Sequence, residues 1–111
     1  MSFTVVPLTT DTVTNVSGAF PVANNKSLAL AMRITAASGT TPTLDLRVEY
    51  SMDGVNWAIG DPTTADAFTQ RSSPYTAAKV FVPKGDFYRV RWTIAGTTPS
   101  FTFDVLGTWL R

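Results

Sequence analysis

The stretch Lys-Ser-Leu-Ala-Leu-Ala-Met-Arg-Ile-Thr-Ala, residues 26–36, decides the fold class. Its large apolar side chains alternate with small or polar ones, so one side of an extended strand is apolar. The same alternation recurs in residues 44–50, 88–94 and 101–109. A period of two is typical of strands that bury one face, whereas no stretch of ten residues has the periodicity of a helix. The sequence therefore predicts β-sheet.

The composition also predicts β-sheet, and the length of the chain limits the number of domains. The chain has 111 residues, with eighteen threonines against three lysines and a single glutamate, a balance that favours strands over helices. Its length suits one domain. We predict an all-β protein that forms a single antiparallel β-sandwich of about seven to eight strands over residues 1–111, Ig-like or jelly-roll. Residues 1–16 are expected to form an N-terminal arm or an edge strand.

The alternation also suggests how the strands pair. Matching the apolar rows predicts that the first two alternating stretches form one hairpin and the last two another. In these registers Arg33 faces Asp45 and Arg91 faces Asp104, and opposite charges across a strand pair are mildly stabilising. Shorter strands are predicted near residues 3–6, 12–16, 19–22, 65–69 and 79–82, with residues 60–77 as the longest connection, crossing from one sheet to the other.

Two sequence motifs predict turns. Asp53-Gly54 between alternating residues is typical of a tight type I′ hairpin, which would pair Tyr50 with Trp57. The segment Gly-Thr-Thr-Pro occurs twice, at 39–42 and 96–99, each time between alternating stretches. This repeat has two explanations: an internal duplication that gives a pseudo-symmetric sandwich, or independent use of the same turn sequence.

The chain lacks the residues that most hydrolases and metalloenzymes use. With no histidine and no cysteine, it has no Ser-His-Asp or Cys-His triad, no usual zinc site and no thiol redox chemistry. The remaining candidates for paired-carboxylate hydrolysis or calcium binding are Glu49, Asp53, Asp61 and Asp66, for which solvated surface carboxylates are the simpler interpretation. We predict a protein that is not an enzyme and has no catalytic residue, cofactor or metal.

Charge and hydropathy limit the partners. The formal net charge is +1, so no strong overall field attracts nucleic acid or an acidic membrane. No apolar run approaches the roughly 20 residues of a membrane span, and the N-terminus lacks the pattern of a signal peptide. We expect no nucleic acid and no membrane as partners, and synthesis in a cytoplasm.

Several surface residues have both a structural and a functional interpretation. Four arginines at outward strand positions either bind phosphate or pair with Asp45, Glu49 and Asp104. Large apolar residues on otherwise polar faces are covered by a loop or contact a partner subunit. The predicted partner-binding residues are Phe3, Val5, Val6, Leu8, Phe87, Leu106 and Leu110. Three aromatic residues pack in the core or form a platform for sugar, namely Trp57, Tyr75 and Trp109.

Two longer motifs resemble known proteins. The run Tyr-Ser-Met-Asp-Gly-Val-Asn-Trp, residues 50–57, resembles a hairpin motif found in many β-sandwich modules, discoidin-like domains included. The run Gly-Asp-Phe-Tyr-Arg-Val-Arg-Trp at 85–92, followed by Gly-Thr-Thr-Pro-Ser at 96–100, resembles small, cysteine-free β-proteins among tailed-phage structural proteins. This second resemblance covers the C-terminal two-thirds of the chain.

The phage resemblance implies a function. It suggests a virion component, a capsid decoration protein that binds the major capsid protein or other virion subunits, or a tail or head–tail connector subunit. Such proteins bind a protein lattice, often as trimers, so a homo-oligomer is expected, with a trimer favoured. The N-terminal apolar segment is the predicted contact, adding a strand to a neighbour's sheet. The alternative function is a carbohydrate- or receptor-binding β-sandwich module.

Overall fold

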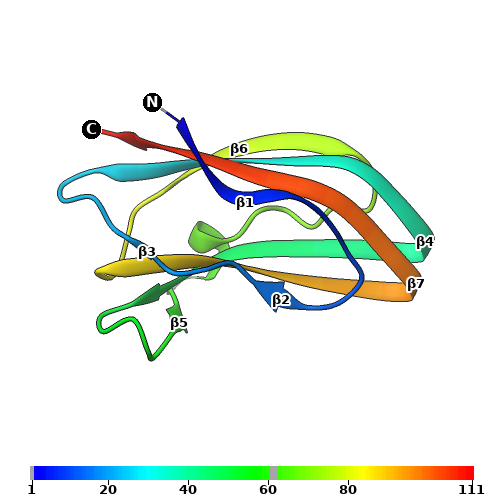
Figure 1. The fold of residues 1–111 in the computed structure, drawn as a ribbon, viewed down its shortest axis with the longest axis horizontal. Helices are drawn as coiled ribbons and strands as arrows, with labels where there is room; N and C mark the ends of the chain where they lie inside the picture. The colour runs from blue at the N-terminus through cyan, green and yellow to red at the C-terminus, as the bar shows by residue number, and fades with distance from the viewer. Residues whose placement is uncertain (1, 61–62) are drawn as a thin grey trace.

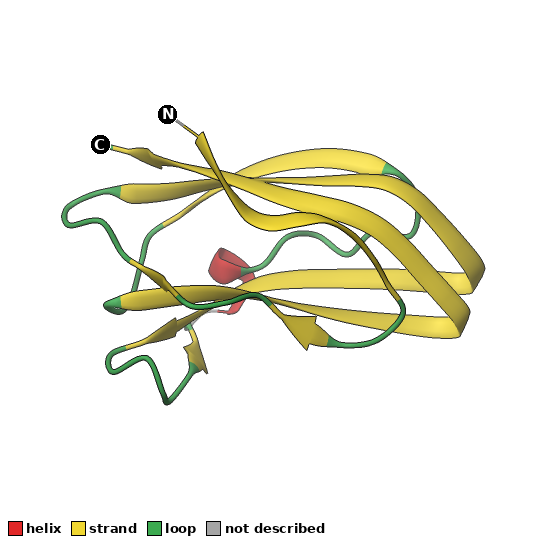
Figure 2. Cartoon of the chain, in the orientation of Figure 1, coloured by secondary structure: helices red, strands yellow, loops and turns green. Residues whose placement is uncertain are grey.

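The computed structural model describes residues 2–60 and 63–111, and the all-β prediction is confirmed. Those residues form an antiparallel sheet of seven strands, which folds over into two layers (Figure 2). No helix among them is long and apolar enough to span a membrane. The elements are β1 (Ser2–Asp11), β2 (Asn15–Val16), β3 (Phe20–Pro21), β4 (Ser27–Ser51), β5 (Ala58–Ile59), the 3₁₀ helix η1 (Thr63–Asp66), β6 (Tyr75–Phe81) and β7 (Phe87–Leu110).

Two long bent strands, β4 and β7, belong to both layers (Figure 1). They pair along their whole length, from Ser27 opposite Leu110 to Ser51 opposite Phe87. The upper layer consists of β1, the second half of β7, the first half of β4, and β6. The lower layer consists of β2 and β3, the first half of β7, the second half of β4, and β5. Strand β1 lies at one edge of the sheet, as predicted for an edge strand.

The two hairpins predicted from the alternating stretches are wrong. Both stretches of β4 pair with β7, and neither pairs with the stretch that follows it in sequence. Leu30 lies opposite Gly107, and Val48 lies opposite Val90. The predicted Arg33–Asp45 and Arg91–Asp104 pairs are therefore absent, and Arg33 instead pairs with Asp104. Alternation fixes which side chains face inward, but any strand with a matching apolar row satisfies it.

The two Gly-Thr-Thr-Pro segments are not hairpin turns but form the corner at which β4 and β7 bend together (Figure 1). Thr40 lies opposite Thr97 at the middle of the corner, and the register shifts on both sides of this pair. On one side β7 has the extra residue and on the other side β4 has it, so the bulges are reciprocal. Pairing therefore continues around the bend.

The corner requires glycine in both strands. Gly39 and Gly96 have φ of 111° and 126°, in the region that favours glycine. A Cβ on Gly39 would lie 2.7 Å from the carbonyl oxygen of Thr98, and one on Gly96 would lie 2.8 Å from that of Thr41. Each glycine thus lets the backbone of the other strand approach. The two segments fit each other in the same way, which gives the repeat a structural role whatever its origin.

The Asp53-Gly54 hairpin is confirmed, but its register is one residue off the prediction. Tyr50 lies opposite Ala58 instead of Trp57. The loop is longer than a type I′ turn because the Asp53 carboxylate accepts hydrogen bonds from the backbone N–H of Val55 at 2.8 Å and Asn56 at 2.9 Å. These hydrogen bonds hold the pKa of Asp53 well below its usual value.

The shorter elements agree only partly with the prediction. The strand predicted at residues 65–69 is instead η1 followed by a single bridge between Ala67 and Arg47. Residues beyond η1 close one side of the sandwich, where Phe68 is buried and meets Phe81 at 5.5 Å between ring centroids. The remaining predicted strands correspond to β1, β2, β3 and β6 with shifted ends.

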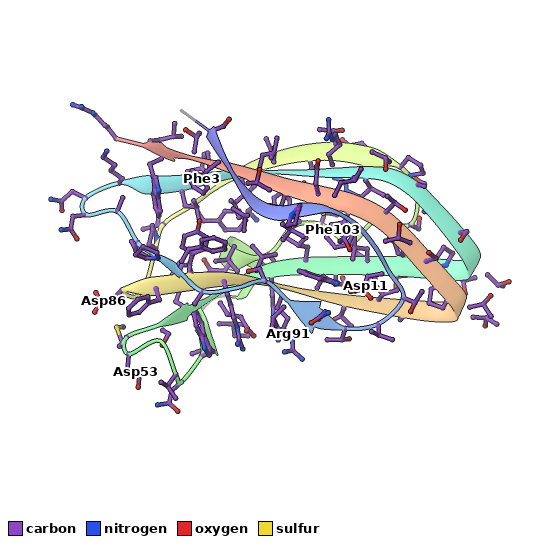
Figure 3. All side chains as sticks on the ribbon, in the orientation of Figure 1. Phe3, Asp11, Asp53, Asp86, Arg91 and Phe103 are labelled. Atoms are coloured by element: carbon purple, nitrogen blue, oxygen red, sulfur yellow. The ribbon has the colours of Figure 1, made fainter. Side chains whose placement is uncertain are left out.

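The predicted inward rows form the core. Residues 28, 30, 32 and 34 of β4 are buried in the upper layer, as are 44, 46, 48 and 50 in the lower layer. From β7, Trp92 and Phe103 come from opposite layers and meet edge to face, with ring centroids 5.2 Å apart. Figure 3 shows Phe103 between the layers. The two-residue alternation therefore predicted correctly which side chains lie in the core.

Replacing either corner glycine should destabilise the protein. Gly39→Ala or Gly96→Ala puts a Cβ against the facing backbone at a positive φ, for which we expect a loss of about 1–3 kcal/mol in the free energy of unfolding. Gly18→Ala is the control, because its Cβ would meet nothing within 4 Å. Chemical denaturation checks this, and equal effects at positions 18 and 39 would contradict the proposed corner.

Stability should fall at alkaline pH because of a buried tyrosine. Burial raises the pKa of Tyr88 to about 12, above the value near 10 of an unfolded tyrosine. The native state therefore holds this proton more tightly, so the stabilisation is complete below pH 10 and is lost between pH 10 and about 12. Denaturant unfolding across this range measures the slope, which should be shallower in Tyr88→Phe. An unchanged slope in that variant would rule out the assignment.

Candidate interaction surfaces

Three of the predicted partner-binding residues do not lie on a free surface. Val5 and Val6 are 4% and 3% exposed and belong to the core. Phe3 is half-buried, with its ring centroid 6.2 Å from that of Trp109 and its ring over Gly107. The predicted partner contact is wrong for the side chains of Val5 and Val6, because β1 pairs with β7 of its own chain and buries them.

The other four predicted residues lie in different places. Leu106 and Leu110 are 36% and 40% exposed and lie on the second half of β7, in the upper layer. Phe87 is half-buried in the lower layer, beside Gly54. Leu8 is 59% exposed on β1. The predicted residues therefore do not form one patch, and only Leu106 and Leu110 share a continuous apolar surface.

That surface is the outer side of the upper layer. Leu106 lies opposite Ala31, which lies opposite Ala78 on β6. In the next row across the strands, Thr108 lies opposite Ala29, which lies opposite Val80 on β6. On β4 and β7 these side chains point away from the core, because the residues next to them, such as Leu30, Val105 and Gly107, are buried. On β6, Ala78 and Val80 are exposed. We call this surface the apolar face, with Ala29, Ala31, Ala78, Val80, Leu106 and Leu110.

The apolar face has a hollow and carries no net charge. A hollow of about 330 Å³ lies over Ala29 and Ala31, beside Leu106. The face ends at a row where Arg33 and Asp104 form a salt bridge. The sequence also indicates this surface, although it was not predicted. The outward positions of residues 28–32 are alanines, where a solvated strand carries polar side chains.

The outer side of the lower layer has the opposite character. Glu49 accepts from Arg89 Nε at 2.9 Å and from Arg47 Nη2 at 3.3 Å. Arg91 lies directly opposite Arg47 and points away from the layer (Figure 3). Three of the four outward arginines therefore form ion pairs: Arg33 and Arg89 across the β4–β7 pair, and Arg47 with Glu49 of its own strand.

The three predicted sugar-binding aromatics do not form a row. Trp57 lies under the Arg89 guanidinium at 4.5 Å, and Tyr75 under that of Arg71 at 3.7 Å. Trp109 is half-buried in the upper layer. On β4, Tyr75 lies opposite residue 34 and Trp109 opposite residue 28, a separation of about 20 Å along the strand. No single groove can use Tyr75 and Trp109 to stack on adjacent sugar rings.

The carboxylates considered for chemistry are engaged in structural contacts. Glu49 pairs with two arginines, and Asp53 organises its loop. Asp61 lies outside the described residues. Among the described residues, no three His, Cys, Asp or Glu side chains come close enough to hold a metal ion.

Asp66 forms a buried cluster that attaches η1 to the sheet. The residue is 1% exposed, and its Oδ1 accepts from Lys84 Nζ at 2.9 Å and from the Tyr50 hydroxyl at 3.2 Å. Burial and the nearby Asp66 carboxylate raise the pKa of Tyr50 far above its usual value, so this phenol stays a proton donor. The geometry of this cluster is that of a structural anchor.

No family model matches the chain, and comparison with curated proteins and with solved structures gives no match either. The chemical interpretation of the surfaces therefore depends on the geometry alone.

Removing the cation of the buried cluster should destabilise the protein. Lys84→Met leaves the Asp66 carboxylate buried without its ion pair, and we expect a loss of about 1–3 kcal/mol because Lys84 is itself partly exposed. Lys26→Met is the matched control at an exposed lysine. Thermal or denaturant unfolding gives the comparison. If the two variants unfold alike, the cluster does not anchor η1.

Proposed function

We propose that the protein is a non-enzymatic structural subunit of a bacteriophage particle, a capsid decoration protein that binds the coat lattice. The observation that carries the proposal is the contrast between the two outer sides of the sandwich. The upper side is apolar around Ala29, Ala31 and Leu106, whereas the lower side holds ion-paired arginines. Exposed apolar surface of this kind is typical of a protein that is buried in an assembly.

The edge of the upper layer supports the same proposal. Among the described residues, β1 pairs only with β7, so its other side offers backbone N–H and C=O groups. An exposed strand edge can accept a strand from a neighbouring subunit. Although Val5 and Val6 face the core, the backbone of β1 remains suited to the contact with a coat subunit.

The phage resemblance of residues 85–100 is the basis for choosing a virion among possible assemblies. A tail or head–tail connector subunit fits the same surfaces and differs in its location on the particle. The carbohydrate-binding alternative receives less support, because Trp57 and Tyr75 are each covered on one ring face by an arginine.

Purified particles test the proposal. Phage particles from a culture of the source organism are banded on a density gradient, digested and analysed by mass spectrometry, and immunogold labelling locates the chain. We expect the chain in the particles, with label on the head. Label on the tail would favour the connector alternative, and absence from particles that contain coat and tail proteins would refute the proposal.

A glycan array separates the remaining alternative from the virion proposal. The purified chain should bind no glycan across a broad panel. Saturable binding that is lost in Tyr75→Ala, but kept in Val55→Ala at an exposed apolar position of another loop, would favour the carbohydrate-binding module.

A further inference from the structure

We propose that the apolar face binds a second copy of this chain, with a two-fold axis parallel to the strands and midway between β4 and β7. This inference names the partner of that face and rests on the proposed function as an assembly subunit. It follows from the sizes and charges of the side chains that the four strands of the upper layer present outward.

The side chains of the apolar face differ in size from strand to strand. One row across the strands contains Thr4, Leu106, Ala31 and Ala78, and the next contains Ser2, Thr108, Ala29 and Val80. Val80 is 53% exposed, and Val82, just beyond β6, is 65% exposed. In both rows the residue on β7 is larger than the alanine beside it on β4.

A two-fold axis in this position places each outward side chain of β7 over a smaller residue on β4 of the other copy. Rotation about an axis between β7 and β4 places β7 of one copy over β4 of the other, and β1 over β6. Because the axis is parallel to the strands, residues at the same height face each other. Leu106 lies opposite Ala31 in its own sheet, so it would face Ala31 of the second copy and enter the hollow above the alanines.

The electrostatics of the face also suit a second copy. A partner with a strong charge would find no complement on this face, since Arg33 and Asp104 neutralise each other at its end. Two identical neutral surfaces, in contrast, come together without repulsion. Both copies contribute the same patch, which is the condition for a closed two-fold interface.

The size of the face predicts how tight the contact is. Four strands about 4.8 Å apart and six residue steps of about 3.3 Å give roughly 400 Å² per copy, or about 800 Å² in total. Stable complexes bury about 1,200–2,000 Å². We therefore expect a weak dimer in solution that becomes stable in a particle, where several contacts act together.

Sedimentation equilibrium of the full chain, over rising protein concentration, tests the dimer. The wild type should follow a monomer–dimer equilibrium, and Leu106→Lys or Ala31→Glu should each weaken association at least tenfold. Val55→Lys, at a loop residue that is 76% exposed, should leave it unchanged. Mixing Leu106→Lys with Ala31→Glu should restore association, because the new charges face each other across the axis.

Cysteine crosslinking gives a second measurement that does not require a charged residue on the sheet. The chain has no cysteine, so a mixture of Ala31→Cys and Leu106→Cys should form a disulfide-linked dimer on oxidation, faster than a mixture of Val55→Cys and Leu106→Cys.

A wild type that stays monomeric, a trimer, or equal crosslinking in both mixtures would overturn the two-fold contact. None of these results affects detection of the chain in purified particles, so the dimer and the virion proposal fail separately.

Discussion

The reciprocal fit of the two Gly-Thr-Thr-Pro segments determines the rest of the structure. Each segment has a glycine at positive φ against the other strand's backbone, and each has a threonine in the left-handed region, Thr41 at 46° and Thr98 at 47°. A β-branched residue rarely adopts this conformation. Each of these threonine hydroxyls donates to the preceding carbonyl at 2.8 Å. The strain is shared equally by β4 and β7, and it allows a paired ribbon to turn a corner without losing its partner.

This corner explains why both layers can share one pair of strands. Because β4 and β7 stay paired on both sides of the bend, the inner rows of the two layers face each other without a separate connection. The remaining elements need only extend the layers, with β1 and β6 beside the upper half and β2, β3 and β5 beside the lower half. The core and the two outer faces follow from this arrangement.

The fold class and the buried rows could be predicted from the sequence, because buried and exposed side chains alternate along each strand. Leu30, Val48, Val90, Trp92 and Phe103 are all buried as predicted. The strand partners could not be predicted in this way. The apolar rows of the four alternating stretches are interchangeable, and Gly-Thr-Thr-Pro is compatible with a hairpin turn as well as with a corner. The choice between them depends on contacts between residues 57 positions apart, such as Thr40 with Thr97, which no local pattern contains.

The candidate surfaces were only partly predictable, again because the sequence did not indicate which strands are neighbours. Leu106 and Leu110 stood out as apolar residues at outward positions, and they do lie on the apolar face. Val5 and Val6 were assigned to a partner contact because their strand had no evident neighbour, and the neighbour proved to be the second half of β7. The alanines of β4 become informative only once β6 and β7 are known to flank them.

The central claim is that β4 pairs with β7 on both sides of the corner, and nuclear Overhauser effects between backbone protons test it most directly. The structure predicts contacts of Leu46 with Trp92 and of Ile34 with Phe103, since these residues lie opposite each other. Backbone contacts of Met32 with Leu46 and of Trp92 with Phe103 would instead indicate two separate hairpins and would contradict this account.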